Sequence, residues 1–446
     1  MEKIKLAVEK YKQLILDAER FIWAHAETGY KEFETSKYME EAFEKLGYDL
    51  VKAENITGFY TVIDTNKPGP EVMILAELDS IICPEHKDAN PITGAVHSCG
   101  HNAQCAALLG IAGALKEPDV LEGLCGRIRL CAVPAEELLE IEYRTELKNK
   151  GIIKYFGGKS EFLYRGYFDG VDIAFMVHTT TADTYSVKKG SVGFLAKMAT
   201  YKGVASHAGG FPEKGINALY AANCGLNAVN AIRERFKESD IVRVHPIITN
   251  GGAMVNAIPE KAVIESYVRA STFEAIKNIN QQVNQALCGA ALSIGANIDI
   301  YDVPGYAPLV NDDNMIELSE KAAKLIVPEY GFNNIKGMGA GSTDMGDLSC
   351  VMPVVHPYAC GAKGRSHGND YEIVNPISAC VDNAKFQLAI LKLLLSDGAK
   401  EAKKVISEFV PMFKTKEEYF EFVDALGCSG DRINYSNVGE VTVNVR

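Results

Sequence analysis

Apolar residues along this chain follow two different spacings. In the first half, apolar positions three and four residues apart predict helices, and short apolar runs bounded by glycine and proline predict strands. The helices are expected near residues 3–25, 34–46 and 101–116. The strands are expected at 58–64, 71–79, 127–135 and 171–179. Helices and strands in this order are typical of a layered α/β domain.

The pattern changes in the middle of the chain. Between about 190 and 302 it predicts a smaller set of strands with two helices, at 215–236 and 272–295. After 303 it returns to helices and short apolar strands. We therefore predict a second domain, 190–302, inserted into a first domain. The first domain is expected to comprise 1–189 and 303–446.

Polar residues stand at the ends of three predicted strands. Asp79 ends one strand, Glu136 and Glu137 follow the next, and His178 lies near the end of the third. In an open α/β sheet the carboxyl ends of the strands face the ligand-binding crevice. We expect these side chains to converge there.

Composition and charge narrow the classes of partner. Of the 446 residues, 47% are hydrophobic and 23% charged, which is the balance of a globular protein. A formal net charge of -12 repels phosphate backbones and anionic lipid, so we expect neither a nucleic-acid nor a membrane partner. The apolar run at 388–395 is interrupted by Lys392 and is far shorter than the roughly 20 residues of a membrane span, so it predicts a core helix.

Cysteine usage and the amino terminus bear on location. The chain has eleven cysteines, an odd number without the tight spacing of a disulfide scaffold. Its first 21 residues form a charged amphipathic pattern without the apolar core of a secretion signal. Together these features favour a cytoplasmic protein.

The segment HSCGHNAQC at 97–105 is the first candidate metal site. Cys99 and His101 flank Gly100 just before a predicted helix, and a glycine there allows a tight turn with both side chains on one side. Thiolate and imidazole both suit a divalent transition metal. The alternative is a buried cysteine beside a helix-capping turn.

The segment VPAEELLE at 133–140 supplies two adjacent carboxylates. Glu137 as a metal ligand and Glu136 as the base that deprotonates water would divide the work of metal-assisted hydrolysis. Otherwise the pair is a solvated helix start. His178 and His367 complete the candidate ligands, since each gains its value from the set. The remaining histidines are left out of the ligand set, namely His25, His86, His97, His245 and His356.

Five motifs then point to a family. HSCGHN, VPAEE, SHAGGFPEKGINA, GGAMVNAIPEKAVIESYVR and GSTDMGDLS stand in the order found in the aminoacylase/carboxypeptidase family of co-catalytic metallopeptidases, which the chain resembles from about 25 to 375. It is most similar to the branch with a cysteine ligand, and within it to aminobenzoyl-glutamate hydrolases and aminoacylase-like dipeptidases. The segments HAETGYKEFET and AELD depart from the usual family pattern.

The resemblance implies a metallopeptidase-type layered α/β catalytic domain with an inserted smaller α+β dimerisation or lid domain. It implies two divalent ions per subunit, manganese or zinc, with cobalt or nickel also suited. Cys99 would bridge them, and Glu136 would be the base. The other metal ligands would be His101, Glu137, His178 and His367. Asp79 would support a ligand from behind.

In the inserted domain, the resemblance implies that His207 reaches the reacting carbonyl of a partner subunit, which requires a homodimer. Asn256 and Arg269 would hold the substrate carboxylate. A guanidinium suits this task because it grips a carboxylate through two parallel hydrogen bonds. The glycine-rich run at 337–349 lacks the lysine of a phosphate loop and is expected to form pocket wall.

The function implied is hydrolysis of an amide bond in a small substrate with a free carboxylate: an N-acyl amino acid, a dipeptide or an aminobenzoyl-glutamate-like compound. Two other readings stay open. One is a relative that binds metal or peptide without catalysis. The other is a cysteine-nucleophile hydrolase that uses Cys99 with His101.

Overall fold

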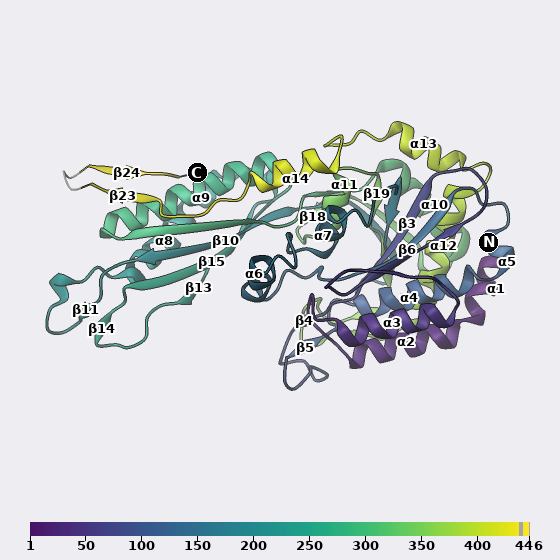
Figure 1. Ribbon diagram of the computed structural model, residues 1–446, viewed down its shortest axis with the longest axis horizontal. Coiled ribbons are helices and arrows are strands. Elements are labelled where there is room, and N and C mark those ends of the chain that lie inside the picture. Colours follow the sequence, from purple (N-terminus) through teal and green to yellow (C-terminus); the bar gives the residue numbers. More distant parts are fainter. Residues whose placement is uncertain (437–439, 446) are drawn as a thin grey trace. The chain divides into compact units, whose positions relative to one another are not determined.

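The computed structural model describes residues 1–436 and 440–445 and divides into two compact units (Figure 1). Unit 1 comprises Met1–Gly190, Leu309–Gly339 and Thr343–Lys416. Unit 2 comprises Ser191–Pro308, Ala340–Ser342 and Glu417–Arg446. The chain thus leaves unit 1 near residue 190 and returns to it near 309.

A six-stranded sheet forms the centre of unit 1, in the order β1-β2-β6-β3-β7-β19. Strands β3, β6, β7 and β19 run parallel, and β2 is antiparallel to β6. All seven residues of β3 are buried, as expected of a parallel strand covered on both faces. The strands are β1 (Val51–Lys52), β2 (Phe59–Asp64), β3 (Glu71–Glu77), β6 (Arg127–Val133), β7 (Ile173–Phe175) and β19 (Val354–Val355). The predicted α/β class is confirmed.

Helices of unit 1 pack around this sheet. Helix α4 packs on β3 and β6, and each of its residues is buried, which is why its sequence is apolar on all sides. The apolar run at 388–395 lies in α12 and is buried almost throughout, so the predicted core helix is confirmed. The helices are α1 (Glu2–Lys10), α2 (Lys12–Ala24), α3 (Phe33–Lys45), α4 (His101–Ala114), α5 (Pro118–Leu121), α6 (Ile141–Asn149), α7 (Gly158–Tyr164), α10 (Asp313–Ile326), α11 (Met345–Ser349), α12 (Asn383–Leu395) and α13 (Lys400–Glu408).

Two predicted elements of unit 1 are divided. The amino-terminal helix is interrupted at Tyr11, where ψ changes to 7°. The strand expected at 171–179 becomes β7 and a separate strand β8 (His178–Thr180), and β8 belongs to another sheet. That sheet has the order β17-β9-β20-β8, with β18 paired to β9. Its strands are β17 (Leu309–Val310), β9 (Tyr185–Ser191), β20 (Tyr358–Cys360) and β18 (Phe332–Gly339). His178 therefore begins a strand instead of ending one.

Unit 2 is an antiparallel sheet, β12-β15-β10-β16 with β13 beside β15, packed against two helices. Side chains buried between sheet and helices form its core. The elements are β10 (Gly193–Lys202), β12 (Arg243–Val244), β13 (Ile247–Asn250), β15 (Lys261–Ala270), β16 (Asn297–Pro304), α8 (Ala218–Ile232) and α9 (Phe273–Ile294). A separate two-stranded ribbon joins β11 (Ser206–His207) to β14 (Ala257–Ile258).

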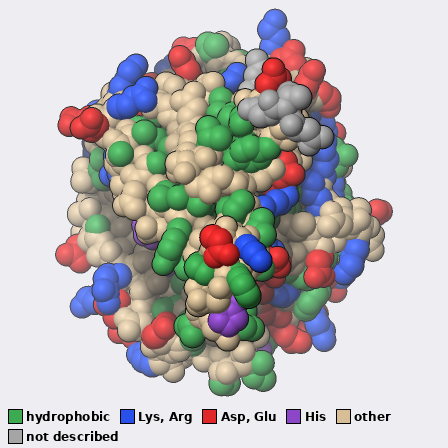
Figure 2. Space-filling view, turned by 90° about the vertical axis from the view of Figure 1, so that its left-hand side faces the viewer, with side chains coloured by type: hydrophobic (Ala, Val, Ile, Leu, Met, Phe, Trp, Pro, Cys, Tyr) green, Lys and Arg blue, Asp and Glu red, His purple; other side chains and the backbone are tan. Residues whose placement is uncertain are grey.

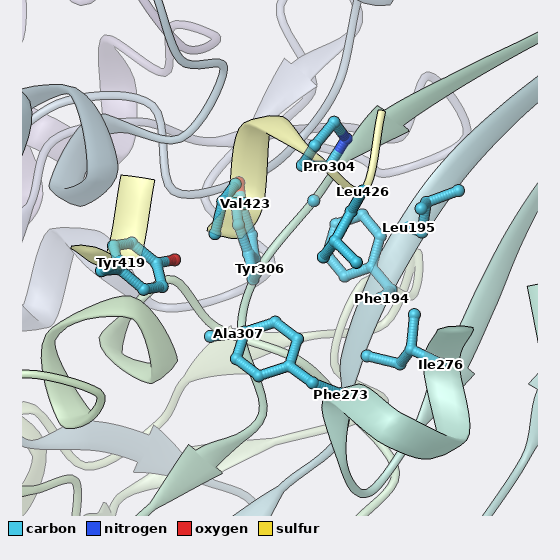
Figure 3. A pocket seen from close by; sticks show the side chains of 11 residues that line it. Phe194, Leu195, Phe273, Ile276, Pro304, Tyr306, Ala307, Tyr419, Val423 and Leu426 are labelled. Carbon is cyan, nitrogen blue, oxygen red and sulfur yellow. The ribbon is translucent and has the colours of Figure 1, made fainter. Parts of the chain in front are cut away.

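The carboxyl-terminal segment packs with unit 2, whereas the sequence analysis assigned it to the first domain. Cys428 exchanges backbone hydrogen bonds of 2.8 and 3.2 Å with Asp302 of β16, and Ile433 joins the core of unit 2. Helix α14 (Lys416–Asp424) contributes Tyr419 and Val423 to a small apolar pocket that Phe194 of β10 also lines (Figure 3). The final strands are β23 (Ile433–Tyr435) and β24 (Val441–Val443). The apolar pattern of this segment contains no local signal for which sheet it will join.

None of the helices formed by residues 1–436 and 440–445 has the length and hydropathy needed to cross a bilayer.

Candidate metal centre

A sharp turn presents Cys99 and His101 together. Gly100 has φ of 90°, and a Cβ there would collide with the hydroxyls of Thr179 and Tyr371, so only glycine fits. Helix α4 begins immediately afterwards, at His101. The turn therefore places a thiol and an imidazole on the same side of the backbone.

Two groups of candidate ligands share Cys99. One contains Cys99, His101 and His178, and the other contains Cys99, Glu137 and His367, with all ligand atoms of each group within 4.8 Å of one another. The Cys99 sulfur lies 3.3 Å from Nε2 of His178, and Oε1 of Glu137 lies 2.9 Å from Nε2 of His367. The five residues singled out from the sequence as ligands thus lie together around one thiol.

Hydrogen bonds behind these residues fix their orientation. Nδ1 of His101 lies 2.9 Å from the Asp79 carbonyl oxygen and 3.3 Å from its carboxylate, and the backbone N–H of Glu137 donates to the same carboxylate at 2.9 Å. Nδ1 of His178 lies 2.8 Å from the Thr179 carbonyl oxygen. In both histidines Nδ1 is therefore the protonated nitrogen, and Nε2 remains for a ligand.

The loop that carries His367 is tied to the same turn. The backbone N–H of His367 donates to the Ser98 carbonyl at 2.8 Å, and the φ of His367, 62°, is rare for a residue other than glycine. The His367 side chain is half exposed, whereas Cys99 and His101 are buried. His367 lies beside Cys83, Glu85 and Arg365, which line an open cleft in unit 1.

These donors fit divalent metal ions. Nε2 of His101 is fully buried and makes no hydrogen bond among the described residues, although the Glu77 carboxylate lies 3.2 Å from it, so a cation beside Nε2 would satisfy both groups. Burial and Glu137 raise the pKa of Cys99, but the neighbouring His178 and His101 outweigh them and lower it to about 6. A thiolate, imidazoles and a carboxylate form a donor set suited to zinc and related ions.

Nearby charges also give the two adjacent glutamates very different pKa values. Hydrogen bonding and charge from His367 overcome burial and lower the pKa of Glu137 to about 2. Burial, with the charges of Glu77 and Glu137, raises the pKa of Glu136 well above its usual range. Two carboxylates with such different pKa values are suited to different tasks, one as a metal ligand and one as a proton carrier.

The bend that presents both glutamates is held by two buried side chains. Ala135 has φ of 57°, and its N–H donates to Oε1 of Glu32 at 2.8 Å, while Oε2 of Glu32 accepts from the Thr57 hydroxyl at 2.6 Å. The Arg144 guanidinium donates to the Glu137 carbonyl. Neither Glu32 nor Arg144 was singled out from the sequence, because their partners are distant along the chain or are backbone groups.

We expect Glu32→Gln to change how stability depends on pH. Burial, and then the charge of Asp79, raises the pKa of Glu32 from 4.5 to about 8. The folded chain then holds a proton that the unfolded chain releases above pH 4.5, so stability falls as pH rises from 4.5 to 8. Glutamine can accept from the Ala135 N–H with its oxygen and donate to the Thr57 hydroxyl with its NH2 group, and it cannot ionise. In urea unfolding of chelated protein, the variant should be close to the wild type near pH 5 and exceed it by about 5 kcal/mol at pH 9. Identical pH profiles would show that Glu32 is ionised at neutral pH.

The structure also places residues near the centre that the sequence analysis had not chosen. Glu77 forms a third group of close ligand atoms with His101 and Glu136. His356, set aside earlier, is buried with its ring centroid 5.8 Å from that of His178. Glu77 had one available signal, since it is a carboxylate at the carboxyl end of a strand whose residues are all buried.

The remaining predicted residues all belong to unit 2. His207 and Asn256 are both exposed at the β11–β14 ribbon, where the Ala208 N–H donates to the Asn256 carbonyl at 3.0 Å. Arg269 lies on β15, stacks over the Phe194 ring and donates to the Ser342 hydroxyl at 2.8 Å. Within unit 2, Arg269 thus lies near the opposite end of β15 from the ribbon.

Residues 73–393 match peptidase family M20/M25/M40. The chain belongs to this family. The match spans most of the chain and includes the Cys99 turn, the Glu136–Glu137 bend and the loop of His367. The resemblance noted from the sequence motifs is confirmed.

Several known proteins are similar to this chain, over different lengths. The chain is 29% identical over 291 residues to Xaa-Arg dipeptidase of Mus musculus, covering 64% of this chain and 62% of that protein. It therefore spans less than two thirds of that mammalian relative. It is 29% identical over 328 residues to N-acetyl-L-cysteine deacetylase of Bacillus subtilis, covering 70% and 72%. The structure of a dinuclear metal-binding M20 peptidase of Bacillus subtilis has a TM-score of 0.65 at 20% identity, covering 86% and 99%, and shows the shared fold.

Proposed function

We propose that this chain is a metal-dependent amidohydrolase that uses two divalent ions to cut an amide bond near a free carboxylate. The observation that carries the proposal is the pair of ligand groups sharing Cys99, with buried Glu136 next to them. The substrate is an N-acyl amino acid, a dipeptide or an aminobenzoyl-glutamate-like compound. The two relatives above, a dipeptidase and a deacetylase by name, support an amide of this kind.

The ligands fall into two sets in this proposal. Cys99, His101 and His178 hold one ion, and Cys99, Glu137 and His367 hold the other. Asp79 orients His101 and the backbone of Glu137. Manganese or zinc is the proposed metal, and cobalt and nickel suit the same donors.

When bound, the two ions act as Lewis acids that lower the pKa of water and polarise the amide carbonyl. Glu136 takes the proton from the attacking water and then donates it to the leaving amine. Its burial and the neighbouring carboxylates support this role, because they make it a better proton acceptor than an ordinary glutamate. Bond cleavage thus passes one proton from water to amine through a single carboxylate.

Arg269 and Asn256 are proposed to hold the substrate carboxylate, and because they lie apart within one unit 2, the two would come from different subunits. The stacking of Arg269 over Phe194 and its hydrogen bond to Ser342 support this role, because they restrict the guanidinium to few orientations. A positioned guanidinium loses less entropy when a carboxylate binds. Ser342 belongs to the glycine-rich run that the sequence analysis assigned to pocket wall.

We further propose a homodimer in which His207 serves the partner subunit's centre. Large apolar side chains near His207 are exposed, with Val255 fully exposed and Met254 62% and Phe211 54% exposed. Figure 2 shows hydrophobic side chains gathered on the face at this end of unit 2. Large exposed apolar side chains grouped on one face support a protein–protein contact. All eleven cysteines are unpaired, which supports a reducing, cytoplasmic location.

One observation favours a second candidate function. The low pKa of Cys99 and its 3.3 Å contact with His178 resemble the thiolate–imidazole pair of a cysteine hydrolase. In that case Cys99 attacks the carbonyl itself. The carboxylate and second imidazole on the other side of the thiol favour metal binding instead.

A substrate panel separates these readings. Purified protein is tested on N-acyl amino acids and dipeptides, before and after chelation, with Mn²⁺ and Zn²⁺ added back separately. We expect chelation to abolish cleavage and one ion to restore it, and Arg269→Lys to raise KM about tenfold or more for carboxylate substrates. Matched amides without the carboxylate should be poor substrates for both proteins. Cleavage that survives chelation but is lost on thiol alkylation would support the cysteine nucleophile, and two bound ions without any cleavage would support a non-catalytic relative.

A further inference from the structure

Lys159 is a fully buried cation beside the proposed centre. It lies on α7, its side chain is 0% exposed, and its Nζ is 2.5 Å from Oε1 of Glu77 and 2.5 Å from Oδ1 of Asp344. Its backbone N–H also donates to Oδ2 of Asp344 at 2.8 Å. The mechanism above makes no use of this lysine. A buried ammonium costs several kcal/mol unless it is well paired, so its presence needs a reason.

The pairing reaches a proposed metal ligand. Oε2 of Glu77 lies 3.2 Å from Nε2 of His101 and accepts a hydrogen bond from Gln104 at 2.9 Å. Glu77 therefore lies against the nitrogen of His101 that faces the centre, while Asp79 holds the opposite nitrogen. The His101 ring is held between two carboxylates, and Lys159 fixes one of them.

Without Lys159, the same atoms would form a cation site. Glu77, His101 and Glu136 have ligand atoms within 4.8 Å of one another, and Asp344 joins Glu77 at the Lys159 ammonium. Oxygen and nitrogen donors in such a buried group suit a divalent ion. The Lys159 ammonium lies between these carboxylates and is covalently part of the protein.

Close packing leaves α7 no freedom to withdraw Lys159. A Cβ at Gly158 would collide with the carbonyl of Pro134, so the start of α7 lies directly against the bend that carries Glu136 and Glu137. The glycine is required by this approach of two backbones. Lys159 and the proposed base thus belong to one rigid assembly within unit 1.

We propose that Lys159 is a built-in cation of the metal centre: it occupies the place of a third ion and, through Glu77, holds the His101 ring in position. It is a positioning residue, since it touches neither the proposed ions nor the substrate. The inference rests on the proposed function, because it takes His101 as a metal ligand. It predicts that the ammonium limits the centre to two ions.

Unit 2 offers a matched control. Lys197 is likewise 0% exposed and paired to a buried aspartate, Asp302, with a further hydrogen bond of 2.6 Å to Asn284. It belongs to the core of the other unit, so its loss removes a buried ion pair without touching the candidate ligands. Lys159→Ala and Lys197→Ala therefore differ in which unit loses its ion pair.

The experiment counts ions. Full-length wild type, Lys159→Ala and Lys197→Ala are dialysed against Co²⁺, bound ions per subunit are measured, and the visible absorption of the bound Co²⁺ is recorded. We expect two ions in wild type and Lys197→Ala, and three ions with altered absorption in Lys159→Ala. Turnover of Lys159→Ala should fall about tenfold or more, mainly in kcat. A folded Lys159→Ala with two ions and the wild-type spectrum would overturn the inference.

A second pair of variants serves if Lys159→Ala does not fold. Glu77→Gln keeps the shape of the side chain but removes its charge, and Asp302→Asn does the same beside Lys197. We expect Glu77→Gln alone to change the Co²⁺ absorption, because His101 loses its charged neighbour. Identical spectra in both variants would overturn the inference. Fewer than two ions in the wild type would instead contradict the proposed function itself.

Discussion

Replacing Glu136 by glutamine is expected to lower turnover about 1,000-fold while leaving both metal ions bound. In the proposed mechanism Glu136 carries the proton from water to the leaving amine, and a glutamine cannot accept it. Glu136 belongs to neither ligand group that shares Cys99, so its loss should not reduce the metal content. The measurement is kcat on the best substrate of the panel, together with metal ions per subunit.

Two neighbouring glutamates provide the controls. Glu137→Gln should lower the metal content, because Glu137 belongs to a ligand group. Glu142→Gln, on the exposed side of α6, should change neither quantity. If Glu136→Gln kept more than a tenth of wild-type turnover, the base would have to be another residue.

Replacing Cys99 by alanine is expected to weaken the binding of both metal ions and to reduce activity about 1,000-fold. Cys99 belongs to both proposed ligand groups, whereas His178 belongs to only one of them. His178→Ala should therefore lose mainly one ion. The measurement is metal content after dialysis against a series of free Co²⁺ concentrations, with the thiolate-to-cobalt absorption as a direct sign of Cys99 ligation.

Cys105 is the matched control for this variant. It is also buried, lies on α4 and donates through its sulfur to the Glu77 carbonyl, but it belongs to no candidate ligand group. Cys105→Ala should keep both ions and the cobalt absorption. An inactive Cys99→Ala that still bound both ions with wild-type affinity would favour the cysteine as nucleophile.

Local sequence signals were sufficient for most elements of unit 1. Apolar runs predicted β2, β3 and β6 nearly to their bounds, because strands buried within a sheet are largely apolar. The same reasoning joined β7 and β8 into one strand. The apolar run at 173–177 continues from β7 up to the start of β8, and the switch from one sheet to another depends on hydrogen-bond partners distant in sequence, such as Tyr358 beside His178.

The candidate ligands followed from chemistry that is local in the sequence. Cys99 and His101 stand beside a glycine, and Glu136 and Glu137 follow an apolar strand, so their types and positions could be read directly. His178 and His367 gained their place from the set of candidate ligands, and the family resemblance implied the same residues. Their distances from Cys99 became known from the fold alone.

The sequence by itself determined the family, the α/β class and the residue types able to hold metal, because motifs and apolar periodicity are properties of short segments. Only the tertiary structure decided what stands behind those ligands. Lys159 lies 82 residues from Glu77 and 185 from Asp344, and the ion pairs among them depend on complete burial. The joining of the carboxyl-terminal segment to unit 2 was decided in the same way. The ion pairs of Lys159 offset the cost of burying three charges, and the carboxyl-terminal segment removes apolar side chains from water. Both effects depend on residues distant in the sequence, which no short segment records.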